Sequence, residues 1–112
     1  MNTLWKILEK AERLCRSTYG RYHPLTAKLN VNIGQALETR SSELNQTDAV
    51  VSDDCLYQAY DRYVENLRIA TEVFGTEHDK TERARSILRQ ATYVWIANNP
   101  RPAKAVKLDD AS

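Results

Sequence analysis

Apolar residues recur every three or four positions in four stretches of the chain, which is the spacing that places them on one face of an α-helix. The clearest stretch spans residues 3–18, where the apolar stripe consists of Leu4, Ile7, Leu8, Ala11, Leu14 and Cys15. Three further stretches predict helices at about residues 24–40, 54–74 and 79–97. The pattern therefore predicts an all-α fold.

Glycine and proline mark the expected helix boundaries. Gly20 and Gly75 follow the first and third stretches, where glycine supplies the left-handed backbone that commonly closes a helix. Pro24 suits the first position of the second helix, because a proline there loses no hydrogen bond and its φ is already helical. Gly34 lies inside that helix, where it costs about 1 kcal/mol relative to alanine. We therefore expect a close contact with another helix at Gly34.

Residues 41–54 interrupt the helical pattern with serine, asparagine, threonine and aspartate, and they carry four acidic and no basic residues. The segment predicts a long acidic loop, with Asp53 or Asp54 capping the next helix. Its charge and its short apolar anchors, Leu44 and residues 49–51, raise the hypothesis that it folds onto the basic fourth helix.

The composition of the chain mainly limits the number of domains and the classes of partner. The 112 residues, 42% of them hydrophobic, predict one helical domain at residues 1–98, and residues 99–112 have no periodic face and predict a disordered tail. A net charge of +1 gives no basic excess, so we expect no nucleic-acid partner. No uncharged apolar run approaches the roughly 20 residues of a membrane span, so we expect a cytoplasmic protein with no membrane partner.

Candidate chemistry is sparse. Cys15 lies on an apolar stripe, which predicts a packed thiol. Cys55 lies at an expected helix start, which predicts a surface thiol. His23 and His78 are the two histidines of the chain, and no further metal ligands recur at suitable spacing around them. We therefore predict no catalytic residue, no cofactor and no metal site, and hence a protein that is not an enzyme.

The chain repeats itself at an offset of 55 residues. Residues 19–26 (YGRYHPLT) align with residues 74–81 (FGTEHDKT), so that an aromatic residue, a glycine, a histidine and a threonine coincide. The flanking helices align as well, with Leu8 on Tyr63 before the junction and Ile33 on Leu88 after it. Two helix-turn-helix units with the same phasing favour an α-solenoid.

These segments resemble the tetratricopeptide repeats (TPRs) of the kinesin light chain type. The resemblance rests on the junction at residues 19–26, which matches the family's Leu-Gly-x-x-His-Pro junction, and on its counterpart at residues 74–78. It covers about residues 3–97. The chain departs from the family at four positions, and these departures suit a capping fourth helix: Asn66, Glu82 and Arg89 stand where the family has alanine, and Asp79 where it has proline.

The resemblance implies a short right-handed TPR-like α-solenoid of about four antiparallel helices, in the order second, first, second, first of the repeat. Residues 23–75 form the complete repeat, with 41–54 as an insertion, and the flanking helices are half repeats. It also implies a protein interaction module, an adaptor or scaffold, that binds peptides in a concave groove. The candidate peptide-binding residues are Lys28, Val31, Asn32, Gln35, Arg83, Ser86, Gln90 and Tyr93. The candidate junction residues are Gly20, His23, Pro24, Gly75 and His78.

The charge of the fourth helix bears on the partner. Its basic residues, Lys80, Arg83, Arg85 and Arg89, favour an acidic or carboxylate-bearing peptide, although an ordinary solvated helix face explains the same charges. Two other functions stay open. SET and MYND domain lysine methyltransferases end in similar helix pairs, so the chain could be such a C-terminal accessory region. The near-heptad apolar stripe at residues 56–74 instead suggests self-association, as a homo-oligomer or within a longer repeat array.

Overall fold

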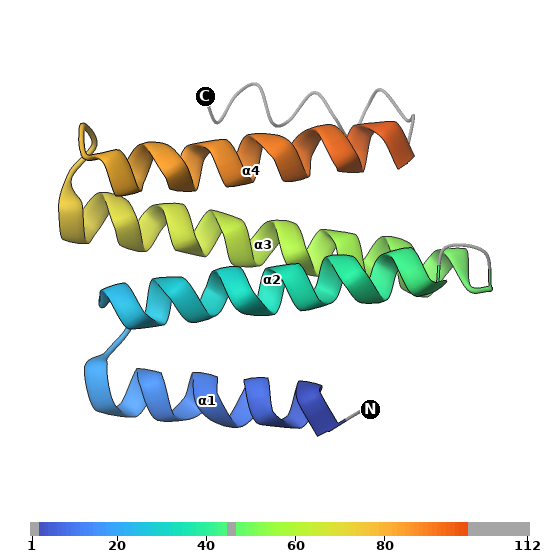
Figure 1. The fold of residues 1–112 in the computed structure, drawn as a ribbon, viewed down its shortest axis with the longest axis horizontal. Helices are drawn as coiled ribbons and strands as arrows, with labels where there is room; N and C mark the ends of the chain where they lie inside the picture. The colour runs from blue at the N-terminus through green and yellow to red at the C-terminus, as the bar shows by residue number, and fades with distance from the viewer. Residues whose placement is uncertain (1–2, 45–46, 99–112) are drawn as a thin grey trace.

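The computed structural model describes residues 3–44 and 47–98, and within these residues it contains four α-helices and no strand (Figure 1). The helices are α1 (Thr3–Tyr19), α2 (Pro24–Leu44), α3 (Ala49–Phe74) and α4 (Asp79–Asn98). Successive helices run in opposite directions, and each lies beside the next in chain order. The predicted all-α class is confirmed for this part of the chain, and the predicted tail at 99–112 lies outside the described residues.

The predicted acidic loop at residues 41–54 is wrong, because most of this segment is helical. Residues 41–44 form the last turn of α2, and residues 49–54 form the first turns of α3. Asp48, rather than Asp53 or Asp54, is the N-cap of α3, and its carboxylate accepts a hydrogen bond from the backbone N–H of Val51 at 3.2 Å. The hypothesis that an acidic loop folds onto α4 is therefore wrong as well.

Ser41 and Ser52 explain why so polar a segment is helical. Both side chains are buried between α2 and α3. The hydroxyl of Ser41 donates to the carbonyl of Ser52 at 2.9 Å, and the hydroxyl of Ser52 donates to the carbonyl of Ser41 at 2.8 Å. Small side chains let the two helices approach closely, and the reciprocal bonds satisfy both hydroxyls in the interface.

The hydrophobic core lies mainly between α2 and α3, which pack together more extensively than any other pair of helices, and one buried residue of α4 completes it. Its buried members are Ile33, Leu37, Cys55, Ala59, Tyr63 and Ala91. Trp5 and Leu8 of α1 pack against one side of this cluster, and Ile87 and Leu88 of α4 pack against it as well. The central hairpin is thus the part of the fold on which both outer helices depend.

Gly34 and Tyr63 set the distance between the two central helices. A Cβ atom at position 34 would lie 2.5 Å from Cε1 of Tyr63 and 2.8 Å from its Cζ, which is closer than nonbonded carbon atoms come. The Tyr63 side chain is only 2% exposed, so the ring has little room to move. The close helix contact predicted at Gly34 is confirmed.

Glycine closes α1 and α3. Gly20 has a φ of +82° and Gly75 a φ of +88°, a region that favours glycine. The hydroxyl of Thr26 donates to the carbonyl of Gly20 at 2.9 Å, and that of Thr81 donates to the carbonyl of Gly75 at 2.6 Å. Each threonine therefore ties the first turn of the next helix back to the end of the previous one.

Histidine occupies the same place in both junctions. Nδ1 of His23 accepts a hydrogen bond from the backbone N–H of Leu25 at 3.1 Å, and Nδ1 of His78 accepts one from that of Lys80 at 3.0 Å. The His23 ring stacks on Tyr19, with a centroid separation of 4.4 Å, and the His78 ring stacks on the preceding aromatic residue at 4.8 Å. Residues 19–26 and 74–81, which align in the sequence, therefore fold in the same way.

The side of α3 that faces α1 carries a group of ion pairs. The Arg62 guanidinium binds the Glu12 carboxylate of α1 and lies 3.3 Å from Oδ1 of Asn30. Glu65 accepts bonds of 2.6 and 2.9 Å from Arg21 and a third, of 2.6 Å, from Arg68. These contacts hold the pKa of Glu65 below its ordinary value, chiefly through the hydrogen bond from Arg21.

The two cysteines lie in different surroundings. Cys55 is 4% exposed within the core, so its predicted place at the surface is wrong, while Cys15 is half-buried on α1. Burial raises the pKa of the Cys55 thiol, although the nearby Arg40 acts in the opposite direction. The helix that contains Cys55 begins at residue 49 rather than 54, which places this residue in its second turn and against α2.

None of the described helices is both long enough and apolar enough to cross a membrane.

Candidate binding groove

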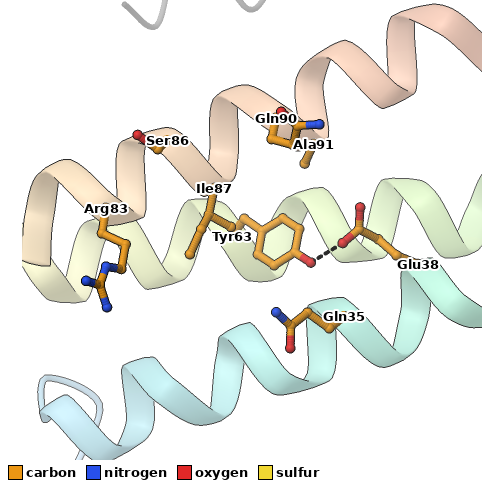
Figure 2. A pocket seen from close by; sticks show the side chains of 8 residues that line it. All are labelled: Gln35, Glu38, Tyr63, Arg83, Ser86, Ile87, Gln90 and Ala91. Atoms are coloured by element: carbon orange, nitrogen blue, oxygen red, sulfur yellow. Dashed lines mark hydrogen bonds between the residues drawn. The ribbon is translucent and has the colours of Figure 1, made fainter.

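An open groove with a volume of about 310 Å³ lies between α2 and α4. Figure 2 shows Tyr63 of α3 between the side chains that the other two helices contribute. The groove is lined by Gln35, Glu38, Tyr63, Arg83, Ser86, Ile87, Gln90 and Ala91. It is therefore built by three of the four described helices, with the central hairpin supplying one wall and the floor.

Tyr63 forms a fixed floor for the groove. Its ring packs against Gly34, and its hydroxyl donates a hydrogen bond to the carboxylate of Glu38 on α2. Burial raises the pKa of Tyr63 well above its ordinary value, and the bond to Glu38 acts in the same direction. The phenol is thus neutral at physiological pH and keeps its proton on the bond to Glu38.

The two ends of the groove carry opposite charges. Figure 2 shows Arg83 of α4 at one end and Glu38 of α2 at the other, with Tyr63 and Ile87 between them. Arg83 is exposed, and it makes no hydrogen bond or ion pair with any residue in the described part of the chain. The polar atoms along the walls come from Gln35, Ser86 and Gln90, whose amides and hydroxyl can both donate and accept.

The groove contains half of the residues that the sequence predicted for peptide binding. Gln35, Arg83, Ser86 and Gln90 line it. The other four predicted residues are not among its lining: Lys28, Asn32 and Tyr93 are exposed on α2 and α4, and Val31 is half-buried against the core.

No protein-family model, curated protein or solved structure matches this chain.

Sequence reasoning missed the other half of the lining, namely Glu38, Tyr63, Ile87 and Ala91. The 55-residue repeat contained a signal for Glu38, because this residue aligns with the predicted Tyr93. Gly34 contained a signal for Tyr63, since a glycine inside a helix indicates a large neighbour. Ile87 and Ala91 are apolar residues of the fourth helix, which suits a core position, and Ala91 belongs to the core as well as to the groove wall.

Most of the basic residues of α4 do not face the groove. Arg85 binds the carboxylate of Glu82 at 2.7 Å and the carbonyl of Thr76 at 2.6 Å. The ammonium of Lys80 lies 5.0 Å from the ring centroid of Phe74, and Arg89 is exposed outside the lining. Of the four basic residues of the fourth helix that favoured an acidic peptide, Arg83 is the one in the groove lining, and the Glu38 carboxylate of that lining carries the opposite charge.

The lining combines charged, polar and apolar groups. A cation, an anion, two amides and the hydroxyls of Ser86 and Tyr63 lie beside the apolar surfaces of Ile87 and Ala91. No group of three or more histidine, cysteine, aspartate or glutamate side chains comes together among the described residues in a way that could hold a metal ion.

Proposed function

We propose that this protein is a non-enzymatic interaction module that binds peptide segments of partner proteins in the groove between α2 and α4. The observation that carries the proposal is the joint position of Gln35, Arg83, Ser86 and Gln90 over a buried Tyr63. Amide side chains facing each other across a groove can bond the N–H and C=O groups of an extended peptide, which have no partners of their own.

We also propose that the helices form a short right-handed TPR-like solenoid, in which α2 and α4 are first helices of a repeat and α1 and α3 are second helices. Two observations support it. Each helix lies beside its neighbour in the chain, and the junctions at residues 19–26 and 74–81 share the same hydrogen bonds. In this proposal, α2 and α3 are the complete repeat, and the protein is a cytoplasmic adaptor or scaffold.

The test is a selection of displayed random peptides on the purified protein, followed by binding measurements on two serine variants. Ser86→Phe places a ring in the groove at an exposed position of α4, where the serine side chain makes no hydrogen bond within the described residues. Ser17→Phe makes the same change at an exposed position of α1, outside the groove.

The proposal expects peptides that bind the wild type and Ser17→Phe equally and bind Ser86→Phe far more weakly. Circular dichroism and thermal unfolding confirm in parallel that both variants keep the wild-type fold. Selected peptides that bind Ser86→Phe as well as the wild type would show that the groove is not the binding surface.

A second candidate function is self-association through α1. Ile7 and Leu14 are 57% and 56% exposed, and their spacing of seven residues puts them on one side of this helix. Sedimentation velocity of the wild type and of the Ile7→Glu/Leu14→Glu variant tests it. A dimer that the double variant converts to a monomer supports self-association, and a wild type that sediments as a monomer at high concentration excludes it.

A further inference from the structure

The opposite charges at the ends of the groove restrict what can bind there. Arg83 marks one end and Glu38 the other (Figure 2). In the 55-residue repeat, Lys28 of α2 occupies the position that Arg83 occupies in α4, and both side chains are exposed. Since α2 and α4 run in the same direction, Lys28 and Arg83, each the fifth residue of its helix, place a cation near the same end of both helices (Figure 1).

Both charged groups at the groove ends can still bind a ligand. Arg83 has no hydrogen-bond or ion-pair partner in the described part of the chain, so all of its N–H donors remain. Glu38 accepts one hydrogen bond, from the Tyr63 hydroxyl. A carboxylate offers about four acceptor sites, so Glu38 can accept further bonds from a ligand while Tyr63 holds it in place.

The rise of α4 gives an approximate length for the groove between its two charged ends. Arg83 and Gln90 are seven residues apart on α4, which corresponds to roughly 10 Å along the helix. Glu38 lies at the Gln90 and Ala91 end of the groove (Figure 2). Because an extended peptide advances about 3.3 Å per residue, this distance corresponds to about three peptide residues.

From this arrangement we infer that the groove selects an extended peptide carrying an acidic and a basic residue about three positions apart, with the acid at Arg83 and the base at Glu38. The inference rests on the proposed function and refines it. The basic fourth helix alone favoured an acidic partner, whereas the groove with both charged ends favours a peptide with both charges. The order and spacing of the two charges, rather than the net charge of the peptide, determine affinity. Between the charges, the peptide backbone meets the amides of Gln35 and Gln90.

The experiment begins with the peptides selected from the random library and measures their affinity by isothermal titration. On the peptide side, the acid and the base are each replaced by glutamine, and the base is moved by one position at a time. On the protein side, Arg83→Gln removes the cation, and Glu38→Gln removes the anion while keeping a carbonyl that can accept from Tyr63. Lys10→Gln, on α1 outside the groove, is the control for a loss of charge.

The inference expects each single neutralisation to lower affinity about two- to fivefold, the range for partly exposed ion pairs. The losses of affinity should not add within each predicted charge pair. In Arg83→Gln, replacing the peptide acid should cause no further loss of affinity, and in Glu38→Gln, replacing the peptide base should cause none. Moving the base away from the spacing of about three residues should reduce affinity as much as removing it does.

Two outcomes would overturn the inference in distinguishable ways. Suppose that the selected peptides are enriched in acidic residues alone, bind Glu38→Gln as well as the wild type and bind Ser86→Phe more weakly. That result would refute the requirement for an acid and a base and leave groove binding intact. A selection that enriches no peptides beyond those obtained with Ser86→Phe, or peptides that bind this variant normally, would refute the proposed function and the inference together. Because the peptide-side changes are measured on the wild-type protein, the result does not depend on the folding of any variant.

Discussion

The two sides of α3 use charged residues in opposite ways. On the side that faces α1, the Glu65 carboxylate binds two guanidinium groups, and Arg62 binds Glu12 across the helix interface. On the groove side, Arg83 has no ion-pair partner within the described residues. Charges that bind each other hold helices in register, whereas an unpaired charge beside a fixed surface is free to meet a ligand.

The difference between the two sides of α3 follows from helix geometry. Tyr63 and Glu65 are two residues apart on α3, so their side chains point about 160° apart around the helix axis. One of them forms the groove floor, and the other forms the centre of the ion-pair group. In the proposed function, a single helix therefore serves both stability and recognition, and substitutions on its two sides should have different consequences.

The largest expected effect is on the groove side, at Gly34. Gly34→Ala should lower the free energy of unfolding by about 1–3 kcal/mol, because the new Cβ overlaps the buried Tyr63 ring and outweighs the helix preference of alanine. Chemical denaturation measures the change. The loss should shrink in a Tyr63→Leu background, where the ring is gone.

Asn32→Ala is the matched control for Gly34→Ala, because it is an exposed position in the middle of the same helix. It should leave stability within about 0.5 kcal/mol of the wild type. If Gly34→Ala instead stabilised the protein by about 1 kcal/mol, as alanine does at an open helical position, the close contact with Tyr63 would be refuted.

The next effect concerns the opposite side of α3. Glu65→Gln should lower the free energy of unfolding by about 1 kcal/mol at pH 7, since it removes the carboxylate that binds Arg21 and Arg68. Glu72→Gln, at an exposed position of the same helix, should have almost no effect.

The Glu65 effect should depend on pH in a defined direction. Because Arg21 holds the folded-state pKa of Glu65 below its ordinary value, its contribution is fully present above the unfolded-state pKa of about 4.3. The contribution is lost as the pH falls through the lower folded-state pKa. Denaturation curves of wild type and Glu65→Gln should therefore converge below about pH 4, and a difference that grew in acid would contradict the ion pair.

The smallest expected change in stability is at Arg83. Arg83→Gln should alter the free energy of unfolding by less than about 0.5 kcal/mol, because the side chain is exposed and binds nothing in the described part of the chain. A loss comparable to that of Glu65→Gln in thermal or chemical unfolding would mean that Arg83 serves the fold, and the contrast between the two sides of α3 would fail.

Local rules predicted the parts of the fold that depend on neighbouring residues. The positive φ of Gly20 and Gly75 and the start of α2 at Pro24 follow from the chemistry of those residues alone. Gly34 indicated a close contact without naming its partner, because the partner lies 29 residues away. The candidate residues implied by the TPR resemblance include half of the groove lining, namely Gln35, Arg83, Ser86 and Gln90.

The two wrong predictions, the loop at residues 41–54 and the surface position of Cys55, have a common physical cause. Ser41 and Ser52 look like loop residues when each is considered with its sequence neighbours, and their helical state depends on the bonds they make across the interface. Cys55 was assigned to the surface because the start of its helix was placed at Asp53 or Asp54 rather than after Asp48. In both cases, contacts between helices outweighed the local preference of the segment.

The central claim is that the groove between α2 and α4 is the binding surface, and the most direct test is chemical-shift mapping by NMR. A selected peptide titrated into ¹⁵N-labelled protein should shift the amide signals of Gln35, Arg83, Ser86 and Gln90, and leave those around Ile7 and Leu14 unchanged. The same titration of Ser86→Phe should give no shifts. Shifts centred on α1, or shifts that survive Ser86→Phe, would contradict the account.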